Sequence, residues 1–298
     1  MDRFAAMSVF VAAVSAGSLS AASRQLRMPL PTVSRKVSEL EASMGAKLLV
    51  RGTRRLALTD VGETYLRACR RILEELAEAE RGASGDYQSP QGELVITAPV
   101  TLGRLHVVPI AAEFLAAHPR VDLRLLLSDR SLNLVDDHLD LAVRVGELPD
   151  STLVAARVGE IRNIVCASPA YLAARGVPKK PQALATHDCV TFTGFGSAEP
   201  WSFRGSESVR VRSRMSVSSA EAAVDAAVCG VGLTRVLSYQ AAAAIADRKL
   251  KVVLRKYEAP PIPVSLVYVR ERRASGKLRA FLDFATPRLR ARLDRATI

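Results

Sequence analysis

The spacing of apolar residues changes once along this 298-residue chain, near residue 90. Before that point apolar residues recur every three or four positions, which is the spacing of one face of an α-helix. From Gly92 onward, short apolar runs alternate with helical segments, a pattern typical of α/β domains. Residues 82–90, rich in Gly, Ser and Pro, lie at the change and predict a hinge. The sequence therefore predicts a helical head, a connector and an α/β body.

The head, residues 1–60, is predicted to hold three short helices and a hairpin. Apolar residues at helical spacing over 4–14 predict the first helix, which Gly17 ends. Ser18 or Ser20 can then cap a second, Ala-rich helix that runs to about Leu26.

A third helix is expected after the turn Met28-Pro29-Leu30-Pro31, because proline suits the first turn of a helix but disfavours helix in the residue before it. Its apolar stripe is Val33, Val37, Leu40 and Met44. Outward-facing residues are then Thr32, Ser34, Arg35, Lys36 and Glu39. A polar, basic N-terminal half is typical of a recognition helix in the DNA major groove.

A hairpin is predicted where alternating apolar residues flank Gly52-Thr53-Arg54-Arg55. Its basic residues, Arg51, Arg54 and Arg55, could reach DNA phosphates or the minor groove. Surface arginines on a small helical domain are also compatible with simple solvation, so the charge alone leaves both interpretations open.

Charge is uneven along the chain, whose net value of +12 favours a polyanionic partner. Residues 1–60 carry 9 basic and 4 acidic side chains, and residues 61–91 carry 4 and 6. The last 29 residues carry 9 and 3, on a predicted helix where a solvated face or a subunit contact is the simpler interpretation. The motifs of the head, more than the net charge, therefore indicate where DNA would bind.

Six short motifs of the head carry a family resemblance. They are Met1-Asp2-Arg3, Gly17-Ser18-Leu19-Ser20-Ala21-Ala22, Val33-Ser34-Arg35-Lys36-Val37, Leu40-Glu41, Met44-Gly45-Ala46-Lys47-Leu48 and Leu58-Thr59-Asp60-Val61-Gly62. In order and spacing they resemble the N-terminal signature of LysR-type transcriptional regulators, over nearly all of residues 1–66.

This resemblance implies a winged helix-turn-helix that binds an imperfect inverted repeat in double-stranded DNA as a dimer. By position, Pro31, Ser34 and Arg35 match residues that the family uses on DNA, and the hairpin arginines match its wing. One departure is Pro29-Leu30, where the family commonly has Ser-Gln. The missing amide puts one adenine-type base contact in doubt.

The connector, residues 61–91, is predicted to be a long helix that starts at Thr59-Asp60, with Glu63 at capping-box spacing from Asp60. An apolar seam at coiled-coil spacing runs along it through Tyr65, Cys69, Ile72, Leu76 and Ala79. Packing within one chain is the alternative, but the flanking breakers favour dimerisation, as the family resemblance also implies. A homodimer or a homotetramer is expected.

The body, residues 92–298, is predicted to hold two α/β lobes with parallel sheets, joined by two crossing segments. Lobe I is assigned to 92–163 plus 266–298, and lobe II to 164–265. Within lobe I a short helix is expected at 132–139, and in lobe II Ser218 and Glu221 have capping-box spacing. The body resembles the type 2 periplasmic-binding-protein fold that LysR-type regulators use as an effector domain.

A small-molecule effector, either a small anion or an aromatic acid, is expected between the lobes. The candidate effector-binding residues are Thr101, Ser128, Arg144, Ser218, Ser219 and Thr234. Ordinary helix capping is the alternative for each Ser and Thr. Arg144 is the stronger candidate, because an arginine inside Leu-Ala-Val-Arg-Val must leave the sheet or find an anion.

The sequence contains no motif that indicates an enzyme, a metal site or a membrane protein. The four histidines show no metal-ligand spacing, and no nucleophile elbow or phosphate loop is present, so no enzyme, metal or cofactor is expected. The four cysteines suggest structural thiols, and no apolar run suggests a membrane span, so the protein is expected in the cytoplasm. Two alternatives remain, a ligand-independent DNA binder and a solute-binding module without a regulatory response.

Overall fold

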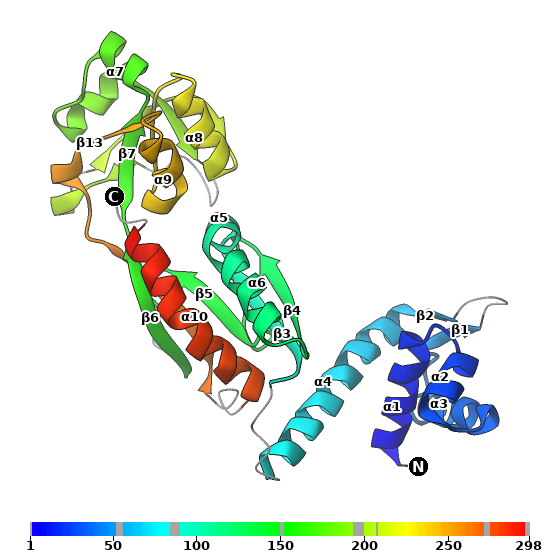
Figure 1. Ribbon diagram of the computed structural model, residues 1–298. Coiled ribbons are helices and arrows are strands. Elements are labelled where there is room, and N and C mark those ends of the chain that lie inside the picture. The colour runs from blue at the N-terminus through cyan, green and yellow to red at the C-terminus, as the bar shows by residue number, and fades with distance from the viewer. Residues whose placement is uncertain are drawn as a thin grey trace. The chain divides into compact units, whose positions relative to one another are not determined.

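A computed structural model describes residues 2–51, 56–83, 90–149, 152–192, 200–206, 208–270 and 275–295. The chain forms two compact units, residues 1–88 and residues 89–298. The first unit is helical with one hairpin, and the second holds two five-stranded sheets (Figure 1).

Three helices build the first unit as predicted. They are α1 (Arg3–Ser15), α2 (Leu19–Leu26) and α3 (Leu30–Met44). Ser18 caps α2 by accepting a hydrogen bond from the Ala21 amide at 3.1 Å, so of the two serines considered it is Ser18 that acts as the cap. The turn between α2 and α3 holds Arg27 in the left-handed region at φ 53°, and Gly45 ends α3 at φ 63°.

The hairpin and the long helix complete this unit. Strands β1 (Leu49–Arg51) and β2 (Leu56–Leu58) pair antiparallel, and α4 spans Asp60–Ala83. The cap of α4 differs from the expected Asp60. The Thr59 hydroxyl accepts from the Gly62 amide at 2.9 Å and donates to the Lys47 carbonyl, which ties the start of the helix to the wing strand.

One sheet of the second unit, here called the lobe I sheet, has the order β4-β3-β5-β14-β6. Its strands are β3 (Gly92–Ala98), β4 (Val121–Leu127), β5 (Leu141–Val145), β6 (Leu153–Ile161) and β14 (Ile262–Val269). Strands β3, β4 and β5 are parallel, whereas β14 runs antiparallel to β5 and β6. The expected parallel sheet is therefore mixed, because the chain enters and leaves the lobe through β6 and β14.

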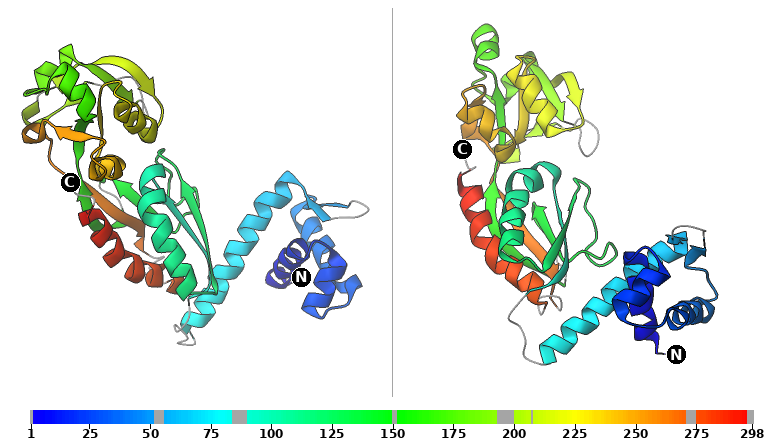
Figure 2. Two further views of the ribbon diagram at one scale, coloured as in Figure 1. Left: turned by 45° about the horizontal axis from the view of Figure 1, so that its top comes forward. Right: turned by 45° about the vertical axis from the view of Figure 1, so that its right-hand side comes forward.

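Helices α6 and α10 lie side by side on the lobe I sheet (Figures 1 and 2). The first helical segment is α5 (Val100–Leu102), a π-helical turn η1 (Gly103–Val107) and α6 (Val108–Ala117). Against it packs α10 (Gly276–Arg295), with the rings of Phe114 and Phe281 5.1 Å apart. Residues 100–117 are long and apolar enough for a membrane span, contrary to expectation, but 44% of them are buried in this core.

The other sheet, here called the lobe II sheet, has the order β11-β8-β12-β7-β13. Its strands are β7 (Asn163–Ala167), β8 (Asp188–Phe192), β11 (Arg212–Val217), β12 (Leu233–Leu237) and β13 (Lys251–Val253). A small hairpin, β9 (Trp201–Ser202) with β10 (Ser208–Val209), lies beside it. The helical elements are α7 (Pro169–Arg175), η2 (Pro181–Thr186), η3 (Arg204–Ser206), α8 (Ala220–Val228), α9 (Ser238–Ala246) and η4 (Arg255–Tyr257).

Two details of the lobes differ from the sequence-based expectations. Because β14 begins at Ile262 and pairs only with lobe I strands, the expected boundary at 265 falls inside this strand. The helix expected at 132–139 is a series of turns. There the Asn133 side chain accepts from the Val135 amide, and His138 adopts φ 55°, so side-chain bonds replace the helical ones.

Candidate functional site

The outward face of α3 carries the residues expected to read DNA. Val33, Val37 and Leu40 are buried against α1 and α2, which turns the polar half of the helix outward. Pro31 and Arg35 are exposed, while Thr32, Ser34 and Lys36 are half-buried. The Arg35 guanidinium lies 3.3 Å from the carboxylate of Glu39, one turn further along the helix. The helix thus presents cationic and hydroxyl groups on one face, as a recognition helix requires.

The wing is anchored by the buried carboxylate of Glu41. It accepts the backbone amides of Leu48 at 2.9 Å and Leu49 at 3.2 Å, and the Lys47 ammonium lies 2.9 Å away. Burial alone would raise the pKa of Glu41, but these hydrogen bonds and the Lys47 charge hold it below its usual value. Arg54, Arg55 and the side chain of Arg51, which were expected to contact DNA, lie outside the described residues.

The apolar seam of α4 divides between two environments. Cys69 is fully buried within the first unit's own core, and Tyr65 and Ile72 pack there too, with the Tyr65 ring 6.0 Å from that of Phe10. The first half of α4 contacts α1 of the same chain and so closes the helical domain. Leu76 lies beyond that core and is half-buried, and the side chain of Ala79 is outside the described part. Of the described seam residues, Leu76 thus lies outside the core of the first unit.

A pocket of about 290 Å³ lies between the two lobes. From lobe I it is lined by Pro99, Thr101, Ser128, Asp129, Arg130, Ser131, Arg144 and Val145. From lobe II it is lined by Phe192, Ala220, Leu237, Tyr239 and Gln240. Its volume is at the lower end of the range for ligand sites, which is roughly 300–1,000 Å³, so it suits a small molecule.

Arg144 is the half-buried cation of this pocket. One of its guanidinium nitrogens donates to the Leu132 carbonyl, and no carboxylate of the described residues forms an ion pair with it. Burial lowers the pKa of Arg144, although a guanidinium remains charged at any physiological pH. A partly desolvated cation without a counter-ion favours binding of an anionic group.

The other expected effector-binding residues separate into two groups. Thr101 and Ser128 line the pocket with Arg144. Ser219 caps α8 by accepting from the Ala222 amide at 3.2 Å, and Thr234 is fully buried and donates to the Val190 carbonyl at 3.1 Å. Ser218 is exposed and does not line the pocket. Capping, the alternative considered for these residues, is therefore the structural role of Ser219, one residue later than the expected Ser218.

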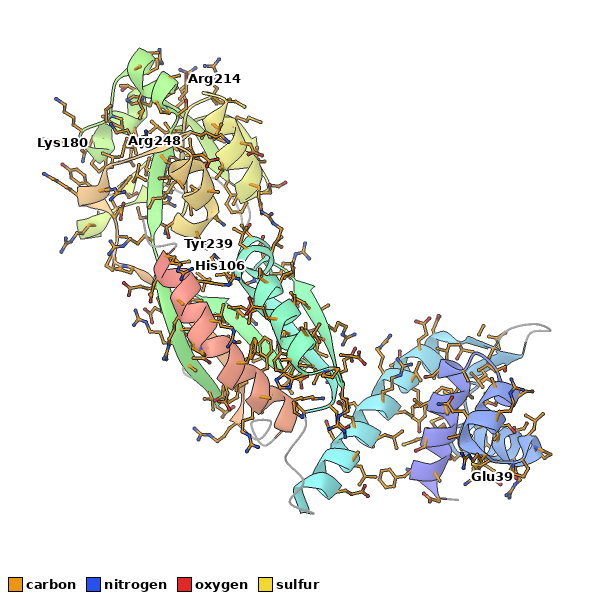
Figure 3. All side chains as sticks on the ribbon, in the orientation of Figure 1. Glu39, His106, Lys180, Arg214, Tyr239 and Arg248 are labelled. Atoms are coloured by element: carbon orange, nitrogen blue, oxygen red, sulfur yellow. The ribbon has the colours of Figure 1, made fainter. Side chains whose placement is uncertain are left out.

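Several pocket residues were not anticipated, and Tyr239 is the most informative. It comes from α9 of lobe II, yet it is 3% exposed and packs into the core of lobe I. Its ring meets that of His106 edge-on at 5.8 Å (Figure 3), and burial raises the pKa of Tyr239. Neither strand β12 nor helix α9 was predicted, so no sequence pattern placed Tyr239 or Gln240 in this pocket.

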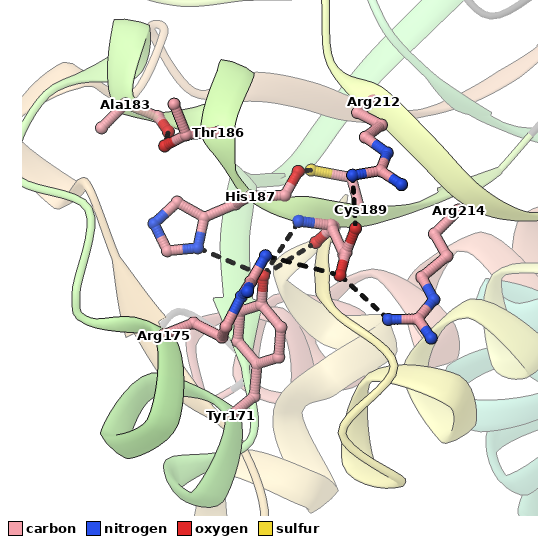
Figure 4. A network of polar contacts seen from close by, with 9 residues as sticks. Tyr171, Arg175, Ala183, Thr186, His187, Cys189, Arg212 and Arg214 are labelled. Atoms are coloured by element: carbon pink, nitrogen blue, oxygen red, sulfur yellow. Dashed lines mark hydrogen bonds and ion pairs between the residues drawn. The ribbon is translucent and has the colours of Figure 1, made fainter.

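Lobe II carries a second polar cluster, centred on Asp188 and drawn in Figure 4. Its carboxylate lies 3.0 Å from Arg214, 3.6 Å from Arg212 and 3.8 Å from Arg175. The Arg214 hydrogen bond is the main reason that the pKa of Asp188 is lowered. The Tyr171 hydroxyl also accepts from the Asp188 amide at 3.0 Å, so the cluster joins α7 to strands β8 and β11.

Across the described ranges, no group of three or more His, Cys, Asp or Glu side chains is placed to hold a metal ion.

Each of the two units matches the model of a known protein family. Residues 4–63 match the model described as "Bacterial regulatory helix-turn-helix protein, lysR family", and residues 87–290 match "LysR substrate binding domain". The chain belongs to the LysR-type transcriptional regulators. This LysR-type regulator thus has a DNA-binding domain followed by a substrate-binding domain with a two-sheet α/β fold.

Individual relatives span nearly the whole regulator. An HTH-type transcriptional regulator of Xanthomonas campestris is 38% identical, over 94% of this chain and 84% of the relative. CrgA of Neisseria meningitidis serogroup B is 35% identical over 95% and 96%. The solved structure of CrgA, at 34% identity, covers 95% of this chain and 98% of its own with a TM-score of 0.62. The full-length structure of the virulence activator AphB from Vibrio cholerae, at 27% identity, covers 94% and 97% with a TM-score of 0.59.

Proposed function

We propose that this regulator binds an inverted-repeat operator as a homodimer or a pair of dimers, and that an anionic small molecule between its lobes controls the response. The effector's negative group would lie on Arg144. The observation that carries this proposal is the half-buried Arg144 guanidinium in the interlobe pocket, with no ion pair to a carboxylate of the described chain.

The DNA-binding half of the proposal is supported by the geometry of α3. Pro31, Thr32, Ser34, Arg35 and Lys36 would enter the major groove, with Arg51, Arg54 and Arg55 of the wing on the neighbouring phosphates or minor groove. Two copies joined along α4, through the seam beyond Ile72, would present two such helices to successive half-sites. The relatives are named as transcriptional regulators, and no enzymatic activity is proposed for this chain.

An electrophoretic shift of the DNA upstream of the protein's own gene tests the first half. A retarded band is expected at low salt, and the complex should persist when random DNA of equal length is added as competitor. Folded, oligomeric protein that retards neither DNA would contradict the proposal.

A thermal-shift screen with small carboxylates tests the second half, because a ligand that binds only the folded protein raises the melting temperature. A rise that depends on Arg144 is expected. A protein that binds the operator but gains no stability from any anion would instead be a ligand-independent DNA binder.

A further inference from the structure

The interlobe pocket is lined by charges of both signs, and two carboxylates lie at the first turn of the helical segment that starts with α5. There the Asp129 carboxylate accepts from the Val100 amide at 3.0 Å. The Glu221 carboxylate accepts from the Thr101 hydroxyl at 2.6 Å. Two donors that an incoming anion would need are therefore already bound to carboxylates of the protein itself.

Glu221 reaches this place from the other lobe. It lies in the first turn of α8, one residue beyond Ala220 of the pocket wall. Burial alone would raise the pKa of Glu221, but the Thr101 hydroxyl and the Arg104 guanidinium, 3.6 Å away, hold it below its usual value. Glu221 is thus ionised at neutral pH, and the 57%-exposed Arg104 only partly offsets the two carboxylates.

The pocket is also lined by two arginines. Arg144 is half-buried and Arg130 is exposed, and no described carboxylate forms an ion pair with either guanidinium. Other parts of the wall are apolar and aromatic, formed by Val145, Phe192 and Tyr239 among others. A ligand in this pocket therefore meets guanidinium groups, apolar side chains and, at Thr101, the two carboxylates.

We infer that the effector carries a single negative group, bound at Arg144, and a hydrogen-bond donor or cationic group at the Thr101 end. A second carboxylate there would meet Asp129 and Glu221 in a partly desolvated site, where like charges repel strongly. A donor would instead meet their free lone pairs. Glu221 and Asp129 are then specificity-determining residues that select against dianions, and the inference rests on the proposed anion site at Arg144.

Three ring compounds that differ only at the para position test this inference. They are benzoate, terephthalate and 4-(aminomethyl)benzoate, which carry hydrogen, a second carboxylate and an ammonium group there. Titration calorimetry of the full chain at constant ionic strength should show terephthalate binding more than about tenfold more weakly than benzoate. The ammonium compound should bind at least as tightly as benzoate.

Matched variants assign the discrimination to its residues. Glu221→Gln keeps an acceptor for Thr101 but removes the charge, so terephthalate should gain affinity and 4-(aminomethyl)benzoate should lose it. Asp225→Asn is the control, because this exposed carboxylate lies one turn further along α8 and does not line the pocket. Thr101→Val removes the hydroxyl but leaves the Glu221 charge, so it should preserve the preference against terephthalate even if Glu221→Gln unfolds.

The possible outcomes separate the two proposals. Equal affinity for benzoate and terephthalate in the unaltered protein would overturn the inference, as would an identical response of Glu221→Gln and Asp225→Asn. Binding of none of the three compounds, or binding that Arg144→Ala leaves unchanged, would contradict the anion site of the proposed function itself.

Discussion

At the scale of single residues, the chemistry of the regulator depends on a few charged side chains whose surroundings differ. Arg35 is exposed on α3 and, among the described residues, forms an ion pair with Glu39 alone, a contact that it can exchange for a base edge. Glu41, on the same helix, is 3% exposed and fixed by three hydrogen bonds. Burial therefore separates Arg35, which we propose to recognise DNA, from Glu41, which positions the wing.

We expect Arg35→Ala to relax sequence preference, at a cost of about 1–3 kcal/mol on the specific site, because a base contact is lost. Arg54→Ala should weaken binding to all DNA alike and flatten the salt dependence, since a phosphate contact is lost. Competition assays with operator and random DNA at several salt concentrations measure both. Equal losses on both DNAs for both variants would refute the assigned roles.

Glu41→Gln should destabilise the wing by about 1–3 kcal/mol, because buried amide donors lose a charged acceptor. In the unaltered protein, the folded-state pKa of Glu41 lies below the unfolded value of about 4.3. Its stabilisation is therefore complete above that pH and is lost as the pH falls through the folded-state pKa. Hydrogen exchange at the Leu48 and Leu49 amides measures this. Glu39→Gln is the control on the same helix, because its side chain is 40% exposed, and it should change neither rate.

At the scale of elements, the two halves of α4 lie in different packing environments. Its first half packs on α1 and touches the wing, and its second half leaves apolar side chains such as Leu76 outside that core. The close approach of α4 to the residues just before the wing strand β1 explains why Gly62 is part of the family signature. A Cβ at Gly62 would overlap the backbone carbonyl of Leu48.

Gly62→Ala should therefore push α4 away from the wing strand and cost about 1–3 kcal/mol, the usual range for overpacking. Chemical denaturation followed by circular dichroism would show the loss. The control is Gly276→Ala. Gly276 is the first residue of α10, and a Cβ added there has no atom within 4 Å, so the variant should have nearly unchanged stability.

Leu76→Arg should shift the regulator toward smaller assemblies, because it places a charge in the apolar seam proposed to join two subunits. Sedimentation equilibrium measures the mass, and Glu80→Gln, an exposed position on the same helix, is the control. An unchanged assembly in Leu76→Arg would show that subunits join elsewhere.

At the scale of the whole molecule, the lobes are joined by specific interactions at the pocket. Tyr239 of lobe II is part of the lobe I core, and Glu221 of lobe II binds Thr101 of lobe I. A ligand that contacts both Arg144 and these groups would favour one relative orientation of the two lobes. Binding energy can become a regulatory signal in this way. We expect Arg144→Ala to lose about tenfold or more in effector affinity, the value of a hydrogen bond to a charged group, while operator binding is retained.

The control for Arg144→Ala is Arg124→Ala on strand β4 of the same sheet, whose exposed guanidinium lies 3.9 Å from Glu93 and does not line the pocket. Ligand titration and operator shift of both variants measure the two functions separately. Undiminished effector response in Arg144→Ala would remove Arg144 from the site.

The sequence by itself determined the head, because its contacts are local. Helices α1 to α3, the hairpin and α4 follow from apolar spacing, glycines and prolines within sixty or so residues, and the predicted elements agree with the structure closely. Arg144 was identified for a similar reason, since a charge in an apolar strand needs an explanation wherever that strand lies.

Only the tertiary structure decided which residues line the pocket. Thr101 and Glu221 are 120 positions apart, and Tyr239 comes from a helix that periodicity did not reveal, so no local pattern could bring them together. The same limit made Ser218, Ser219 and Thr234 plausible candidates, because a hydroxyl at a helix start or strand end has the same local signature whether it caps or binds. Sequence patterns indicate whether a side chain faces the core or the solvent, whereas long-range packing determines which other residues it contacts.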